Sequence, residues 1–174
     1  LVQQSLSTSA VQGTNKNAAY QYWGTTSSNV DYTAKDGWYM DLPVSGERVL
    51  NTYDFYDRSN LLEVHSSVPA SGGNTIEQTC TPSSTLESPY VALINSFIGK
   101  PPSIPLMNSN GSVNSAQKDT YESTDVGNRQ SLKSSAMGRS VNATETTLND
   151  GNGNTTNWAR MPIQQLRPNW RQLQ

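Results

Sequence analysis

Hydrophobic residues along this chain recur at alternate positions in short runs, which is the spacing of β-strands rather than of helices. Residues 1–11 place Val2 and Leu6 on one face and serines on the other, and they predict a half-buried strand. Residues 47–56 are rich in aromatic and β-branched residues, and turn residues at 57–60 separate them from a second run, residues 61–68, which ends at Pro69. Together these two runs predict a β-hairpin.

Residues 90–98 are apolar on both faces, so they predict the central core strand, which ends at the glycine and prolines of 99–102. An aromatic cluster at 20–23 and a short run at 76–79 predict two shorter strands. No segment with a helical period lies between these strands. Short strands at close spacing predict an all-β fold, as a sandwich, a barrel or a β-propeller with antiparallel four-stranded blades.

The middle of the chain has a different pattern, with few aliphatic residues and many Ser, Asn and Thr residues from 103 to 157. We expect long polar loops there, with two edge strands around residues 132–137 and 141–148. Hydrophobic residues return near the end, which predicts a closing segment that packs back on the sheets. The chain is therefore divided into three parts: strands in 1–100, a loop excursion in 101–157 and a closing segment in 158–174.

The composition provides few apolar side chains for a hydrophobic core. Of the 174 residues, 33% are hydrophobic and 15% are charged, and Ser, Thr and Asn together make up about a third. Such a composition suits the exposed β-rich surface of a secreted protein. We prefer the interpretation that this chain is part of something larger, whose core is completed elsewhere.

Charge and hydropathy exclude several classes of function. The net charge of −2 gives no basis for electrostatic capture of nucleic acid. No run approaches the roughly 18 apolar residues that span a membrane. The chain begins at Leu1 without a basic segment or an initiator methionine, which predicts a processed or truncated boundary rather than a signal peptide.

Cys80 is the only cysteine and His65 the only histidine. Cys80 is either a buried thiol or, in a secreted chain, one half of a disulfide whose partner lies on a part of the protein beyond this chain. A metal site or a cysteine nucleophile would need further His or Cys residues as partners. We therefore expect neither.

A glycine-rich stretch, residues 150–154, places oxygen-bearing side chains at alternate positions, as calcium loops do. It lacks the glycine of the sixth position, where Thr155 stands, and the acid of the twelfth, where Met161 stands. The pattern favours a plain Gly/Asn turn over a calcium site.

The predicted hairpin offers two sets of groups for catalysis. His65 alternates with Glu63 and Ser67, which would suit a Ser–His–acid set, but no Gly-x-Ser-x-Gly elbow is present. Asp54, Asp57 and Glu63 could supply the paired carboxylates that glycosidases use, although their spacing does not single them out. A solvated hairpin face is the simpler interpretation of both sets, and we expect no enzyme.

Six aromatic residues in the first forty positions could form a sugar-stacking surface. In a sheet poor in aliphatic residues, packing is the simpler role for them. These residues are Tyr20, Tyr22, Trp23, Tyr32, Trp38 and Tyr39.

The most informative stretch is Gly-Trp-Tyr-Met-Asp-Leu-Pro at 37–43, followed by Gly-Glu-Arg-Val at 46–49. In an extended chain Trp38 and Tyr39 point to opposite faces, and Tyr39 shares a face with Asp41. We interpret the two aromatics as structural. The signature residues are Gly37, Trp38, Tyr39, Asp41, Leu42, Gly46, Glu47 and Arg48.

This order of residues resembles the Gly-Trp-Tyr-(aliphatic)-Asp-Leu…Gly-Glu-Arg-Val signature near the end of PilY1-type proteins, the tip-associated adhesins and assembly factors of bacterial type IV pili. The opening Leu-Val-Gln-Gln and the closing Asn-Trp-Arg-Gln-Leu at 169–173 are similar to other marks of that family. The similarity is strongest over residues 1–50 and weaker to residue 100. The hairpin after Arg48 and the polar middle of the chain depart from the family pattern.

The resemblance implies a large exported protein with an adhesive N-terminal part and a C-terminal β-propeller, of which this chain is the terminal portion. It implies a location at the pilus tip on the cell surface and binding to minor pilins, to the rest of the parent chain and to a host or surface ligand. Pilus assembly, twitching motility and attachment are the implied functions. The family's acidic calcium loop is not found in this chain, so calcium is implied only elsewhere in the parent protein.

Two other functions stay open at this stage. One is an enzyme on a propeller scaffold, quinoprotein-like or a glycosidase, which would need convergent acids or cofactor contacts. The other is a free-standing extracellular lectin-like or fibre-forming β-protein. Neither is favoured by a particular motif.

Overall fold

The structure is a computed structural model that describes residues 1–8, 19–49, 51–70, 87–104, 106–107, 127–143 and 145–161. Within these ranges the chain forms β-strands and one 3-10 turn, with no α-helix. The elements are β1 (Val2–Gln4), β2 (Leu6–Ser7), β3 (Tyr22–Thr25), β4 (Trp38–Met40), β5 (Arg48–Val49), β6 (Asp54–Phe55), η1 (Tyr56–Arg58), β7 (Leu61–Val68), β8 (Ser88–Asn95), β9 (Arg129–Ser131), β10 (Gly138–Val141), β11 (Glu145–Asn149) and β12 (Thr155–Ala159).

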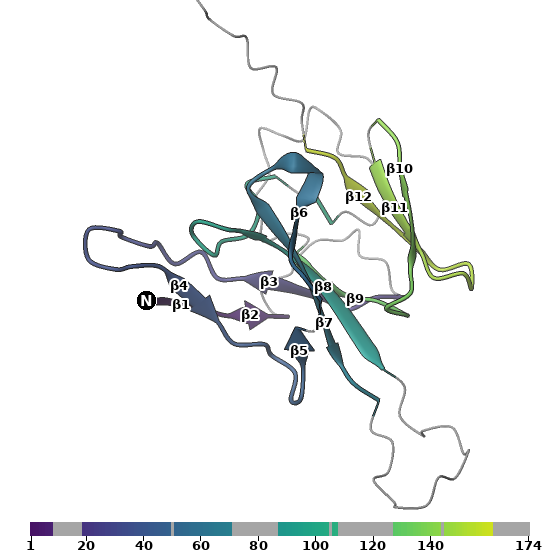
Figure 1. The fold of residues 1–174 in the computed structure, drawn as a ribbon, viewed down its shortest axis with the longest axis horizontal. Helices are drawn as coiled ribbons and strands as arrows, with labels where there is room; N and C mark the ends of the chain where they lie inside the picture. Colours follow the sequence, from purple (N-terminus) through teal and green to yellow (C-terminus); the bar gives the residue numbers. More distant parts are fainter. Residues whose placement is uncertain are drawn as a thin grey trace, which may run out of the picture.

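Seven strands form the main sheet, in the order β2-β3-β9-β8-β7-β5, with β6 also paired to β7 (Figure 1). All of its pairs are antiparallel. The longest pair joins β7 to β8, from Leu61 opposite Asn95 to Val68 opposite Ser88. Val91 and Leu93 of β8 are fully buried, as the apolar run at 90–98 predicts.

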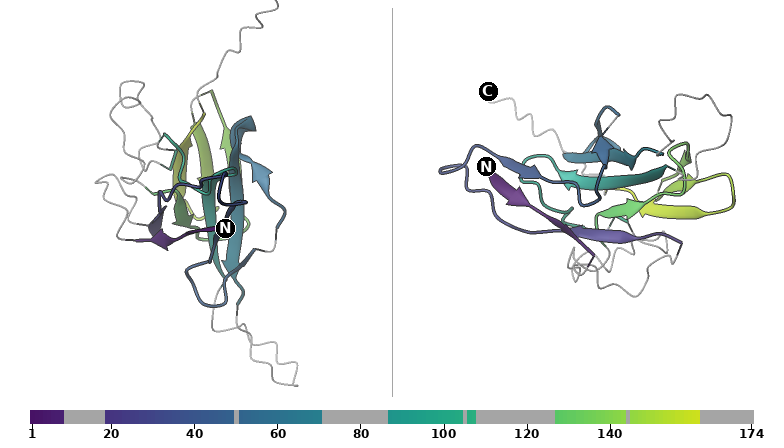
Figure 2. Two further views of the ribbon diagram at one scale, coloured as in Figure 1. Left: turned by 90° about the vertical axis from the view of Figure 1, so that its left-hand side faces the viewer. Right: turned by 90° about the horizontal axis from the view of Figure 1, so that it is seen from below.

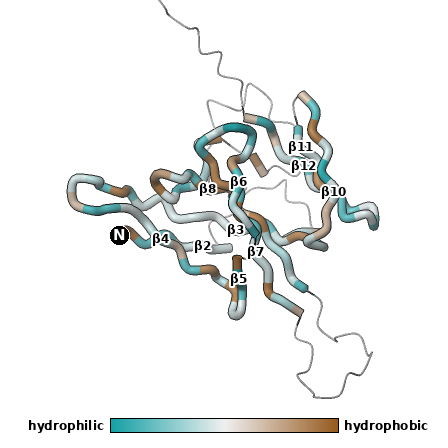
Figure 3. The backbone as a smooth tube through the Cα atoms, viewed as in Figure 1, coloured by the Kyte–Doolittle hydropathy of each residue, from teal (hydrophilic) through white to brown (hydrophobic). Residues whose placement is uncertain are grey.

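A smaller sheet, β10-β11-β12, lies against one face of the main sheet (Figure 2). One hydrophobic cluster joins the two layers, with Leu61 and Leu93 from the main sheet and Leu148 and Trp158 from the small sheet. Hydrophobic segments are short and separated by polar ones along the backbone (Figure 3). Alternate residues of β11 face the core, whereas β8 is buried on both faces.

The N-terminal segment divides between two pairings. β1 runs parallel to β4, with Gln3 opposite Tyr39, whereas β2 pairs antiparallel with β3 in the main sheet. Gln4, at the end of β1, is fully buried, and its amide donates to the carbonyls of Ser28 and Ile98. These bonds satisfy a buried polar side chain and fasten the segment to two loops.

The strand opposite β7 is interrupted by a bulge. Val49 of β5 pairs with Ser66, and Asp54 of β6 pairs with Glu63. Between these two pairs β7 has only residues 64 and 65, and the described residues 51–53 of the other chain segment form no strand. Such bulges bend a strand and often occur at a sheet edge, as here.

The structure confirms the all-β, antiparallel class and the hairpin, since β7 has the predicted bounds and pairs with β5 and β6. The single strand predicted over 47–56 is wrong, because the bulge divides it. The edge strand predicted at 132–137 is also wrong: these residues connect β9 to β10 without strand structure. Two hydrophobic residues in that stretch belong to the core instead, Leu132 inside it and Met137 at its margin.

The single edge strand predicted at 141–148 is divided, because β10 ends at Val141 and β11 begins at Glu145, and the two form an antiparallel pair. The described sheets are open rather than closed into a ring of blades. Cys80, the strand predicted at 76–79 and the closing segment from residue 162 onward lie outside the described residues.

Candidate functional site

The signature stretch 37–49 is attached to the main sheet at two points, and the first is Trp38. Its indole N–H donates to the carbonyl of Ser96 (3.1 Å), and its ring covers Gly99. A Cβ atom at Gly99 would lie only 2.4 to 2.8 Å from three ring atoms, and this residue has φ of +65°. Gly99 is therefore required twice, for its backbone conformation and for the approach of the indole.

Tyr39 and Asp41 face the solvent, on the side opposite to Trp38. Tyr39 is 42% exposed, and Gln3, its neighbour across the strand pair, donates to Asp41 (3.3 Å). The alternation predicted from the sequence is therefore present. Leu42 is half-buried, and Arg48 is exposed in β5.

The second attachment is Glu47, which follows a turn at Gly46 (φ +79°). Its side chain is completely buried, and both carboxylate oxygens accept hydrogen bonds from Nη2 of Arg129, each at 2.8 Å. Ser66 Oγ donates to the same carboxylate at 2.5 Å. The end of the signature is therefore held on β7 and β9 together.

Arg129 is enclosed between two aromatic rings. Its guanidinium lies 4.0 Å from the ring centre of Trp23 and 4.1 Å from that of Tyr90, and only 1% of its side chain is exposed. Burial lowers the pKa of Arg129, while the hydrogen bond and charge of Glu47 act in the opposite direction. We name four side chains the arginine box: Trp23, Glu47, Tyr90 and Arg129. In it, a buried ion pair is covered by two aromatic rings.

A second ionic group, the Glu63 cluster, lies on the opposite face of the main sheet. Glu63 Oε1 accepts hydrogen bonds from Nε2 of His65 (2.7 Å) and from Nη2 of Arg139 (2.5 Å) on β10. The Glu63 side chain is 4% exposed, but His65 and Arg139 are more than a third exposed. Burial raises the pKa of Glu63, but the bonds from His65 and Arg139 outweigh it, and the net pKa is lower than usual.

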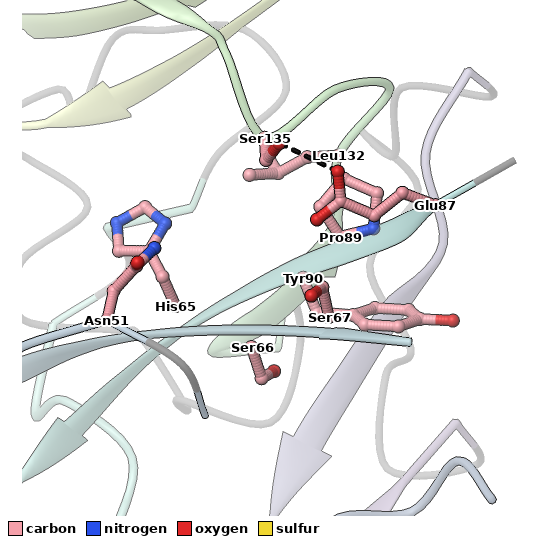
Figure 4. A pocket seen from close by; sticks show the side chains of 9 residues that line it. All are labelled: Asn51, His65, Ser66, Ser67, Glu87, Pro89, Tyr90, Leu132 and Ser135. Atoms are coloured by element: carbon pink, nitrogen blue, oxygen red, sulfur yellow. Dashed lines mark hydrogen bonds between the residues drawn. The ribbon is translucent and has the colours of Figure 1, made fainter. Parts of the chain in front are cut away.

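Beside this cluster is a small hollow of about 30 Å³. Asn51 of the bulge and His65 border it on one side, with Glu87, Leu132 and Ser135 across from them (Figure 4). Ser135 donates to Glu87 (2.8 Å). A hollow of this size has room for about one water molecule and is far below the roughly 300 Å³ of a small-molecule site.

The groups considered for catalysis are not brought together. Ser67 lines the hollow with His65, but no hydrogen bond joins them in the described part of the chain, and His65 Nε2 is used by Glu63. Asp54 stands opposite Glu63 in the β6–β7 pair, but it accepts from the N–H of Phe55, while Glu63 is bound by His65 and Arg139. Asp57 is bound by Arg160, so each carboxylate of the hairpin has its own hydrogen-bond partner.

The calcium-like stretch is a self-contained turn. The Asp150 carboxylate accepts the backbone N–H groups of Asn152 and Asn154 and the side-chain amide of Asn154. Its oxygens are therefore directed at the turn itself. Across the described ranges no group of three or more His, Cys, Asp or Glu residues is placed to hold a metal ion.

The six aromatics considered for sugar stacking divide between core and surface. Tyr20, Tyr22 and Trp23 are buried, whereas Tyr32 and Tyr39 are exposed. Only part of the set could therefore meet a ligand.

Sequence reasoning missed Arg129, which has no spacing that marks it. It lies 82 residues from Glu47, inside the polar middle of the chain. Only the pairing of β9 with β3 and β8 brings it between Trp23 and Tyr90.

Comparison with protein-family models, with curated proteins and with solved structures finds no match for this chain. In the described part of the chain, no helix is long and apolar enough to cross a membrane.

Proposed function

We propose that this chain is a binding and assembly module of a PilY1-type protein at the tip of a type IV pilus. In this proposal it binds minor pilins and supports pilus assembly, twitching motility and surface attachment. The observation that carries the proposal is the signature at 37–49, whose order of residues resembles the family pattern. Its Trp38 and Glu47 both make buried contacts, which gives a physical reason for a fixed residue at each position.

The surface around Trp38 is suited to binding another protein. Three of the exposed large hydrophobic residues lie beside it, at 55 to 66% exposure. Leu1 is next to Gly37, Phe97 lies in the turn that Trp38 covers, and the Tyr32 hydroxyl donates to the carbonyl of Phe97. Clustered apolar side chains on a surface commonly mark interaction sites.

The finer fold assignment, the last blades of a β-propeller, belongs to the same proposal. It rests on the resemblance. The short antiparallel strands are compatible with further strands supplied by a larger parent chain. The extracellular location at the pilus tip rests on the resemblance as well.

The test is a pull-down of minor pilins by the full-length protein that contains this chain. We expect the double variant Tyr32→Ser, Phe97→Ser to lose at least about tenfold in affinity, as expected when aromatic contacts are removed. Val141→Ser is the matched control, since Val141 is also exposed (52%) but lies on β10 of the small sheet. Absence of minor-pilin binding by the unaltered protein contradicts the proposal.

A further inference from the structure

The turn between β6 and β7 contains an unusual backbone. Asp57 (φ 50°, ψ 39°) and the next residue, Arg58 (φ 57°), are both left-handed. They are the only non-glycine residues with positive φ in the described ranges. A residue with a Cβ atom is roughly tenfold less populated in this region than in the right-handed one, so two in succession need support. The N–H and Oγ of Ser59 close the turn by donating to the carbonyl of Tyr56 (3.0 and 2.6 Å), and further support comes from outside the turn.

That support comes from one short segment, residues 159–161, about a hundred positions further along the chain. Arg160 forms an ion pair with Asp57 Oδ1, and the backbone N–H of Met161 donates to Asp57 Oδ2 (2.8 Å). The Tyr56 hydroxyl donates to the carbonyl of Ala159 (2.8 Å). Three bonds therefore connect Tyr56 and Asp57 of the turn to three consecutive residues, 159–161, at the end of β12.

The residues just before this segment are held independently. Trp158 is fully buried, and its indole N–H donates to Gln130 (2.9 Å). The N–H of Ala159 donates to the carbonyl of Leu106 (2.8 Å). The small sheet therefore keeps its own contacts to the core if the bonds to Asp57 are broken, and Ala159 marks the boundary.

Asp57 and Tyr56, which make the bonds at the turn, keep the same protonation state over a wide pH range. The hydrogen bond from Arg160 holds the pKa of Asp57 below its usual value, so the carboxylate stays charged at neutral pH. Burial raises the pKa of Tyr56 to about 12, so its hydroxyl remains a donor. Near neutral pH these bonds are therefore broken by competition for Asp57 and Tyr56 rather than by a change in their protonation.

We propose that η1 and residues 160–161 form a conformational latch. In the closed state, Arg160 and the Met161 N–H hold Asp57 and Arg58 in the left-handed conformation. In the open state the two residues relax to right-handed backbone, and Arg160 and Met161 separate from Asp57. Met161 then leaves the margin of the core, while the buried residues of β8 and β12 stay packed.

The exchange rate of the Met161 amide hydrogen measures this opening directly, since that N–H is one of the bonds that break. We expect Arg160→Gln to accelerate its exchange about tenfold or more, because a charged partner of Asp57 is lost. The Leu93 amide, which donates to Asn128 in the core, should keep its rate. Arg139→Gln, which breaks the other partly exposed guanidinium–carboxylate pair, should leave the Met161 rate unchanged.

The strain is tested by Arg58→Gly, which permits positive φ without a Cβ atom. Since the closed state is then less strained, the Met161 amide should exchange more slowly than in the unaltered chain. The proposal is overturned by an unchanged Met161 rate in Arg160→Gln, or by equal acceleration at Met161 and Leu93, which means global unfolding. Faster Met161 exchange in Arg58→Gly also overturns it.

Discussion

The two faces of the main sheet each carry a glutamate paired with an arginine, in very different surroundings. In the arginine box, the side chains of Glu47 and Arg129 are 0% and 1% exposed. In the Glu63 cluster the carboxylate is 4% exposed, but its Arg139 partner is 38% exposed. The nitrogen–oxygen distances, 2.8 Å and 2.5 Å, are those of charge-assisted hydrogen bonds in both.

The difference lies in what each group can do when its partner is removed. Arg139 can turn its guanidinium into water, and Glu63 then still accepts the bond from His65. Arg129 is fixed between two rings and has no route to water, so its charge would remain buried and uncompensated. Burial, rather than distance, therefore decides how much a pair matters to the fold.

The largest expected effect is that of Glu47→Gln, which keeps the shape of the side chain and removes its charge. We expect the free energy of unfolding to fall by about 3–5 kcal/mol, because Arg129 is left without a counter-charge. Urea unfolding of the 174-residue chain followed by Trp fluorescence measures this. Combining it with Arg129→Met should recover much of the loss, since the buried charge is then gone as well.

The other attachment of the signature gives the next largest effect. Gly99→Ala places a Cβ atom against the Trp38 ring, and we expect a loss of about 1–3 kcal/mol from overpacking plus about 1 kcal/mol from the positive φ. Gly151→Ala is the matched control, because Gly151 also has a positive φ (+77°) but nothing within 4 Å of the added atom. Equal losses in the two variants would show that Trp38 does not restrict the site.

Glu63→Gln should be milder than Glu47→Gln, with a loss of about 1–3 kcal/mol at neutral pH, because its partners reach water. The pKa of Glu63 is lower in the folded chain than its ordinary value near 4.3. Its contribution is therefore fully present above that value and is lost as pH falls through the lower folded pKa. A pH series of urea unfolding should show this acid loss in the unaltered chain and a smaller one in Glu63→Gln.

The smallest effect is expected from Arg139→Gln, at about 0.5–1 kcal/mol, since the guanidinium is more than a third exposed and screened by water. Adding 1 M salt should reduce it further. A loss as large as that of Glu47→Gln would remove the contrast between the two faces.

The alternating patterns were sufficient to predict the all-β class, the β7 strand with its bounds, the core position of β8 and the opposite orientation of Trp38 and Tyr39. All of these depend on neighbours within a few residues. The bulge at 50–53 was missed, because the same apolar alternation continues through it and the register is set by β7. The strand predicted at 132–137 failed for a related reason, since core packing of Leu132 outweighed β-propensity.

In the candidate sites too, features set by nearby residues were predicted and those set by distant contacts were not. Glu47 was selected through the signature, but its role depends on Arg129, 82 residues away, and on two aromatic side chains from β3 and β8. No local spacing contains that information. His65 and Glu63 were recognised as neighbours on one strand face, whereas Arg139 comes from the other sheet and was not foreseen.

Our central claim is that the buried Glu47–Arg129 pair fastens the signature to the sheet. The most direct test is a double-mutant cycle with Glu47→Gln and Arg129→Met, read as free energies of unfolding. We expect the two residues to be coupled by about 2–3 kcal/mol, near the upper end of the range for side chains in contact. A coupling of about 0.5 kcal/mol or less, as for exposed ion pairs, would contradict the claim.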